Sequence, residues 1–198
     1  MKPRKSDSKP REQAPEGNHT ARLLGITDLG HQPGFIWMGK DIPSAWKYEL
    51  TYELVNTEME DGRPFVISEE IKQNFSENPK TKKRSNLMAR ARSLMGQDYM
   101  KVESDVSVML GQPCSVTVEH NENGYAQIKG QAAVGSLAVE LMRIGVKELQ
   151  NTSYVFDMND PDMDLWESFS DFRKGKIRSA LNFDETVLAR TLAESDEY

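Results

Sequence analysis

The sequence predicts a mainly β protein with helices (α+β), built on a five-stranded OB-fold barrel with one helix between strands 3 and 4 and an added C-terminal helix. Two observations carry this prediction. The expected elements follow the order strand, strand, strand, helix, strand, strand, which is the order of an OB barrel. The chain has 198 residues, of which 37% are hydrophobic, so it can bury one core surrounded by polar tails.

Apolar runs and the alternation of apolar and polar residues predict the first two strands. Residues 21–29 are rich in apolar side chains and end at Gly30, which predicts a strand followed by a turn. Residues 44–55 alternate strictly, and this is the strongest strand pattern in the chain. Residues 35–38 form a short run between glycines, which we assign to the same long second strand, broken by a turn at residues 41–44. The apolar face of the alternating segment comprises Trp46, Tyr48, Leu50, Tyr52 and Leu54.

A hairpin and a helix follow. Asp61-Gly62 precedes residues 63–75, where apolar residues again share one face, so we expect the third strand there. Residues 85–95 carry apolar residues at helical spacing, with Ser85 as a plausible N-cap and Gly96 as the stop.

The last barrel strands form a hairpin over residues 113–130, with its turn at Asn123-Gly124. Residues 132–150 stay open between helix and loop. A short strand at 154–156 precedes a helix that starts near Asp162 and is expected to pack on the barrel. Its apolar residues are Leu165, Trp166, Phe169, Phe172 and Ile177.

Composition divides the chain into three parts. Residues 1–20 hold three prolines and five basic residues but no aromatic or branched aliphatic residue, which predicts a flexible basic arm. Residues 21–183 form the predicted OB-fold domain with its C-terminal helix. Residues 184–198 are expected to be an acidic tail.

The charges are segregated along the chain. The protein carries a net charge of −6, yet residues 72–92 contain seven basic residues and one acid. Residues 157–198 contain eleven acids and five basic residues. Such segregation indicates a surface that binds a polyanion, together with an acidic end that competes for it or recruits a partner.

Several classes of protein are disfavoured. No apolar run approaches the roughly 18 residues of a membrane span, and the basic N-terminus lacks the apolar segment of a signal peptide. Cys114 is the one cysteine, so no internal disulfide can form, and its place in an apolar alternation predicts a buried, reduced thiol. We therefore expect a cytoplasmic protein.

Motifs for catalysis are sparse. No phosphate-binding glycine loop, nucleophile elbow or zinc-ligand spacing occurs, so we expect a non-enzymatic protein with no cofactor, no metal and no catalytic residue. His120 lies on a strand face, where a structural role is favoured. Asp160, Asp162 and Asp164 could serve a two-metal nuclease, but acids in the first turn of a helix also complement the helix dipole, and this second reading is favoured.

Aromatic residues interleaved with basic residues on the expected strands are the candidate site. Bases of single-stranded DNA stack on aromatic faces while Lys and Arg follow the phosphates. Strand aromatics are also common core residues, so Trp46, Tyr48 and Tyr52 are assigned to the core as the more frequent alternative. The basic loop before the predicted helix adds a helix N-terminus, which favours a phosphate, although such a loop can equally be a solvated charged segment. The candidate single-stranded-DNA-binding residues are Phe35, Trp37, Lys40, Trp46, Lys47, Tyr48, Arg63, Phe65, Lys72, Lys80, Lys82, Lys83 and Arg84.

Five segments together resemble a known family. They are residues 22–30, 48–54, 61–68, 110–114 and 156–163. The chain is similar over about residues 21–183 to bacteriophage single-stranded-DNA-binding proteins of the OB-fold type. This resemblance implies a protein that coats single-stranded DNA in phage DNA replication or recombination, in the cytoplasm of the infected bacterial host.

The acidic end is similar to the tails of T7-like phage single-stranded-DNA-binding proteins. That resemblance implies recruitment of phage or host replication proteins and competition with DNA for the binding groove. A disordered solubilising tail is the alternative. The residues concerned are Glu194, Asp196, Glu197 and Tyr198.

The expected function is therefore sequence-independent binding of single-stranded DNA, with no membrane partner and with a homo-oligomer possible. A protein-interaction module of a phage assembly or host-takeover system, without DNA binding, is the alternative. Strand annealing and passive coating are both compatible with this function.

Overall fold

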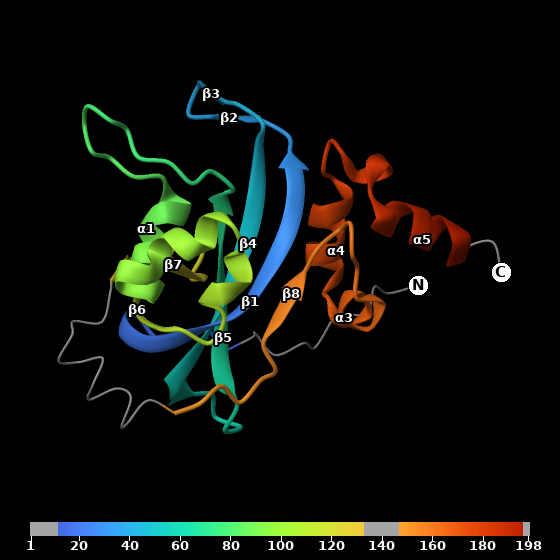
Figure 1. Ribbon diagram of the computed structural model, residues 1–198. Helices are drawn as coiled ribbons and strands as arrows, with labels where there is room; N and C mark the ends of the chain where they lie inside the picture. The colour runs from blue at the N-terminus through green and yellow to red at the C-terminus, as the bar shows by residue number, and fades with distance from the viewer. Residues whose placement is uncertain (1–11, 133–146, 196–198) are drawn as a thin grey trace.

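The computed structural model describes residues 12–132 and 147–195. These residues form a mixed α+β fold in which helices lie on both sides of a mostly antiparallel sheet (Figure 1). The fold class expected from the sequence is confirmed at this level. Residues 133–146, which include most of the segment left open above, lie outside the described residues.

One sheet holds six strands. The path runs β5 (Pro64–Lys72), β4 (Ala45–Glu58), β1 (Gly17–Gln32), β6 (Pro113–His120) and β7 (Ala126–Ala132), all antiparallel. Strand β8 (Tyr154–Phe156) joins β1 in parallel, beyond the segment that pairs with β6. The sheet is not a closed barrel, because among the described residues β5 and β7 contact each other without forming a ladder.

A separate two-stranded hairpin interrupts this order. β2 (Phe35–Trp37) pairs antiparallel with β3 (Lys40–Ile42), and neither belongs to the main sheet. The assignment of residues 35–38 to one long second strand was therefore wrong. The chain reverses at Met38-Gly39, both with positive φ, before the second main strand starts at Ala45.

The first core lies between the sheet and the helix α1 (Asn86–Met95), together with the 3₁₀ segments η1 (Gly96–Glu103) and η2 (Val106–Met109). Ser85 caps α1 by accepting a hydrogen bond from the Met88 amide at 3.4 Å, as expected. Cys114 is buried in this core, and burial raises the pKa of its thiol to about 12. The expectation of a buried cysteine is confirmed.

A second core lies on the other side of β1 and β8. It is covered by α3 (Met163–Ser168), α4 (Asp171–Arg178), η3 (Phe183–Glu185) and α5 (Val187–Ser195). The single C-terminal helix expected from the sequence is wrong, because the chain is extended at Phe169 and Ser170 caps a new helix. This break buries Phe169 and leaves Phe172 80% exposed.

Both ends of the chain are more structured than composition indicated. Residues 17–20 of the expected arm pair with β6, and Ala14 is buried in the first core. Residues 187–195 of the expected tail form α5, whose Leu188 is fully buried in the second core. Asp196, Glu197 and Tyr198 lie outside the described residues.

Candidate nucleic-acid interface

A groove of about 390 Å³ brings together five of the predicted site residues. It lies between the β2–β3 hairpin, the adjoining ends of β4 and β5, and the segment that leads into α1. Figure 1 shows this segment and the hairpin at the same end of the molecule. The five residues in its wall are Phe35, Lys47, Lys72, Lys83 and Arg84.

The groove has a strong excess of positive charge. Of the described residues that line it, Glu70 is the one acid, against three lysines and one arginine. Lys47 is held by Glu70 at 3.1 Å, and Arg84 is held by Glu77 at 2.9 Å. Lys72 and Lys83 are exposed, and no ion pair engages either of them within the described parts of the chain. Two of the four cations are thus available to an anionic ligand without the loss of an existing pair.

The N-terminus of α1 forms one side of the groove. Ser85 and Asn86 line it beside Arg84. An antiparallel bridge between Glu77 and Arg84 closes the base of the loop, and the amides of Lys80 and Thr81 donate to the Asn78 Oδ1 atom. Because the free amides and the dipole of a helix N-terminus favour an anion, α1 adds to the field of the four cations.

Exposed aromatic rings lie on the hairpin and at the start of β4; of these, Phe35 lines the groove, whereas Trp37 and Trp46 do not. Phe35 is 51% exposed and Trp37 is 59% exposed, and strand alternation gives them the same face of the hairpin. Trp46 is 48% exposed and stacks on His31, with ring centroids 5.3 Å apart. Lys40 is exposed on β3 and pairs in register with Trp37. These rings are accessible to a flat ligand, whereas Tyr52 and Leu54 of the same alternating segment are core.

The remaining predicted site residues lie outside the groove. Phe65 is 5% exposed in the first core, so its assignment to the DNA site was wrong. Arg63 forms an exposed ion pair with Asp61 at 2.6 Å in the β4–β5 turn. Tyr48 is half-buried against the first core, and burial raises its pKa.

The basic loop is exposed at its tip. Lys80 and Lys82 are exposed in the loop that leads to the groove but do not line it. Lys82 has a positive φ of 57°, and its amide donates to the Asn78 carbonyl at 2.9 Å.

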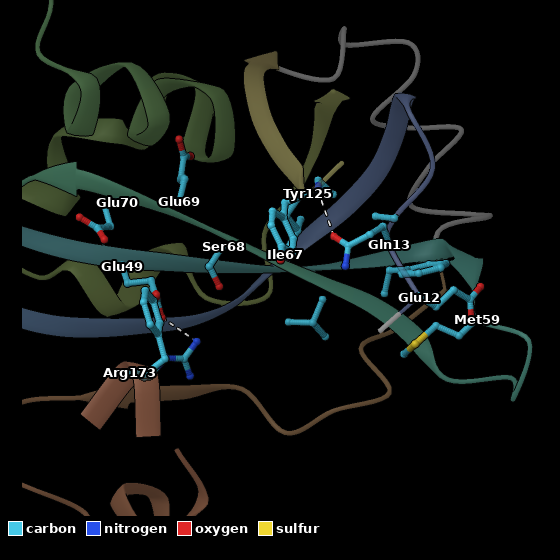
Figure 2. A pocket seen from close by; sticks show the side chains of 15 residues that line it. Glu12, Gln13, Glu49, Met59, Ile67, Ser68, Glu69, Glu70, Tyr125 and Arg173 are labelled. Carbon is cyan, nitrogen blue, oxygen red and sulfur yellow. Dashed lines mark hydrogen bonds and ion pairs between the residues drawn. The ribbon is translucent and has the colours of Figure 1, made fainter. Parts of the chain in front are cut away.

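A larger pocket of about 740 Å³ lies along β5, on the far side of Glu70 (Figure 2). It is lined by four glutamates and a single basic residue, Arg173, which forms an ion pair with Glu49 at 2.6 Å. Burial raises the pKa of Glu49 more than Arg173 lowers it. Glu69 pairs with Arg90, and Glu70 pairs with Lys47 and Lys176. Because Arg173 is also paired, no described residue that lines this pocket offers a free cation to a phosphate, and the smaller basic groove is the candidate site.

Glu70 joins the groove to α4. Its carboxylate pairs with Lys47 on β4 and with Lys176 on α4. Burial opposes ionisation, but the hydrogen bonds and charges of Lys176 and Lys47 outweigh it and lower the pKa of Glu70. Sequence reasoning missed this residue because its role depends on a helix 106 positions away in the chain.

The acids considered for a nuclease have structural roles. The Asp162 Oδ1 atom accepts the Leu165 amide at 3.0 Å and so caps α3, and Asp160 forms a bridge with Asp157. Within the described residues, no three His, Cys, Asp or Glu side chains gather in a way that could hold a metal ion. No described helix is long and apolar enough to cross a membrane.

Comparisons with protein-family models, with curated proteins and with solved structures found no match to this chain. The arrangement of the groove is therefore the basis for the function proposed next.

Proposed function

We propose that this protein binds single-stranded DNA without sequence specificity, through the basic groove beside the β2–β3 hairpin. The observation that supports this proposal is the convergence of Phe35 with Lys47, Lys72, Lys83 and Arg84, which come from four separate segments of the chain. Cations spaced along a groove bind successive phosphates, while exposed aromatic rings offer stacking surfaces that do not depend on base identity.

We also propose that the main sheet is an OB barrel that is open between β5 and β7. The order β5-β4-β1-β6-β7 and the position of α1 between β5 and β6 support this assignment. The OB fold is a partly open five-stranded barrel that binds oligonucleotides. In this reading, the β2–β3 hairpin is an elaboration of the connection between the first two barrel strands, and the groove is formed against it.

The binding mode follows from the geometry. Lys72 and Lys83 contact phosphates directly, and Lys47 and Arg84 exchange part of their pairing with Glu70 and Glu77 for a phosphate. Phe35 stacks on a base inside the groove, while the exposed rings of Trp37 and Trp46 offer further stacking surfaces outside it. The bases of a duplex are paired and stacked on one another, so their faces are not free to stack on these rings, and single strands are preferred. A phage protein with this function would take part in DNA replication or recombination in the bacterial cytoplasm.

A salt titration tests this proposal. Tryptophan quenching by an oligothymidylate is measured between about 50 and 200 mM salt, with a duplex of the same length in parallel. Four groove cations predict a slope of log affinity against log salt of about −2.8, because each phosphate contact of a single strand contributes about −0.7. Equal affinity for the duplex contradicts the preference for single strands, and no binding at the lowest salt overturns the proposal.

Charge variants locate the site. The double variant Lys72→Ala and Lys83→Ala is expected to reduce the salt slope to about −1.4 and to weaken binding equally for every sequence. The control is Lys101→Ala with Lys129→Ala, two exposed lysines on η1 and β7 outside the groove, each of which forms an exposed ion pair, with Asp98 and Glu119 respectively. A protein-interaction module without DNA binding predicts no slope in any of these proteins. Equal loss in the control and in the groove variant contradicts the placement of the site.

A further inference from the structure

The tip of the β2–β3 hairpin carries apolar side chains that are largely exposed among the described residues. Ile36 is 78% exposed and Met38 is 85% exposed, which makes them the two most exposed apolar residues of the four at the tip. Neither lines the basic groove. Strand alternation places Ile36 on the face of β2 opposite to Phe35 and Trp37. The hairpin therefore has an aromatic face toward one side and an aliphatic edge at its end.

Met38 is disfavoured at this position by its backbone as well as by its exposure. Trp37 and Lys40 are paired, so Met38 and Gly39 form a two-residue turn, and both have positive φ, at 47° and 73°. These are the angles of a type I′ turn, in which Asn-Gly is the preferred pair. A long apolar side chain with a left-handed backbone in full contact with water stabilises neither the turn nor a core. Local strain of this kind is found at functional sites, where a ligand contact offsets it.

We propose that Ile36 and Met38 form a wedge that enters between neighbouring bases and opens a duplex end next to the groove. Isoleucine and methionine are among the side chains that proteins insert between base steps, where they unstack the bases. The partner class is stacked nucleic-acid bases at a junction between duplex and single strand. This inference rests on the proposed function, since the groove must hold the strand that leaves the junction.

The charges around the hairpin favour nucleic acid over a protein surface as the occupant. Lys40 lies beside the turn on β3, and Lys47, Lys72 and Lys83 lie in the groove that starts at Phe35. A strand held by these lysines passes the root of the hairpin, so the tip reaches bases that are still paired. A wedge at the tip of a hairpin whose Phe35 lines the basic groove separates bases and captures the released strand. Passive coating requires the groove and the rings alone.

The test uses 2-aminopurine, whose fluorescence rises when it loses its stacking neighbours. A hairpin DNA with a single-stranded thymidylate arm carries the probe at the first paired position, and a second probe lies deep in the duplex. The full-length protein is added at saturation. The wild-type protein is expected to raise the junction signal at least about twofold and to leave the deep probe unchanged.

Met38→Asn is the informative variant, because asparagine tolerates positive φ and forms the preferred pair with Gly39. It is expected to retain or raise the melting temperature of the protein, to bind the thymidylate arm within about twofold of wild type, and to lose most of the junction signal. Ile36→Thr, which keeps strand propensity, is expected to lose part of the junction signal. Met100→Asn is the matched control, since Met100 is 49% exposed on η1, away from the hairpin.

The outcomes separate this inference from the proposed function. If wild-type protein and Met38→Asn bind the arm alike and give the same junction signal, the wedge proposal is overturned, whereas DNA binding by the groove is supported. If wild-type protein fails to bind the arm, both proposals fall. If light scattering shows that wild-type protein is an oligomer that Met38→Asn disrupts, while the junction signal is equal in the two, the tip is a self-association surface and the wedge is overturned.

Discussion

Gly25 lies on β1 directly beneath the ring of Tyr154. A Cβ atom at this position would lie 2.2 Å from the ring Cζ atom, a distance at which the ring or the strand must move. The ring cannot turn aside freely, because its hydroxyl donates to Thr51 at 3.2 Å and accepts from Arg173 at 3.2 Å. The missing side chain thus fixes how closely β8 approaches the sheet.

Gly25→Ala is expected to destabilise the protein by about 1–3 kcal/mol, because overpacking at a constrained contact forces the backbone apart. The measurement is the free energy of unfolding in urea. Gly130→Ala on β7 is the control, since its added Cβ would lie 3.7 Å from the nearest atom, Thr117 Oγ1, at ordinary contact distance. Equal effects at the two positions contradict the explanation from Tyr154.

Single residues differ in how far their pattern predicts them. The burial of Cys114 follows from strand alternation alone and is confirmed. Phe65 was misassigned because an aromatic residue on a strand has the same pattern whether it faces a core or a ligand. The stacking of Trp46 on His31 depends on the register between β1 and β4, which contains two irregularities that no local pattern reveals.

Helix α4 is held on the sheet by charge as well as by packing. Ile177 is buried in the second core, while Arg173 and Lys176 reach Glu49 and Glu70 on β4 and β5. Glu53 on β4 holds the segment that leads into β8, since its carboxylate accepts hydrogen bonds from the amides of Gln150 and Asn151 at 2.7 and 3.0 Å. The face of β4 that carries Glu49 and Glu53 is therefore covered and does not offer a flat surface to a ligand.

Glu70→Gln is expected to destabilise the protein at neutral pH by about 1–2 kcal/mol, because the carboxylate serves two lysines. Since the pKa of Glu70 is lowered from its ordinary value of 4.5 in the folded state, its contribution is present above that value. It is lost as the pH falls through the lower folded value. Urea unfolding of wild type and variant should therefore converge in acid, and a difference that stays constant with pH contradicts this role. Glu122→Gln, in an exposed turn, is the control.

The elements of the main sheet and α1 could be predicted because each has a clear period and a clear stop, such as Gly96 after α1. The β2–β3 hairpin could not, because Met38-Gly39 is not a recognised turn pair and the strands have three residues each. The break between α3 and α4 was missed because Phe169 and Phe172 fit one helical stripe, although Ser170 caps a new helix.

The basic groove and the acidic C-terminal part belong to one chain of net charge −6. The structure shows where the basic charge of residues 72–92 lies. Some of these side chains line the groove, some lie in the loop that leads to it, and some form ion pairs with partly buried partners. Arg90, for example, pairs with Glu69 at 2.7 Å and faces the first core. Charge counting could predict the presence of a basic site but not which cations are already neutralised.

Removal of residues 194–198 deletes three acids and is expected to tighten binding of single-stranded DNA by roughly threefold at low salt, because a local anionic competitor is lost. The gain should disappear at high salt, where such interactions are screened. Oligonucleotide titration at both salt concentrations measures the effect. Conversion of Glu103, Glu119 and Glu122 to glutamine, which removes the same number of charges elsewhere, is the control, and an equal gain there excludes competition by the tail.

The parallel pairing of β8 with β1 also constrains how the chain is made. Gly25, Ile26 and Thr27 leave the ribosome long before their partners Tyr154, Val155 and Phe156. At typical rates of synthesis the delay is roughly 6 to 25 seconds, during which this stretch of β1 presents an unsatisfied edge. This stretch of the nascent chain is thus exposed to mispairing and to chaperones until residues 154–156 emerge. The second core can form only after that.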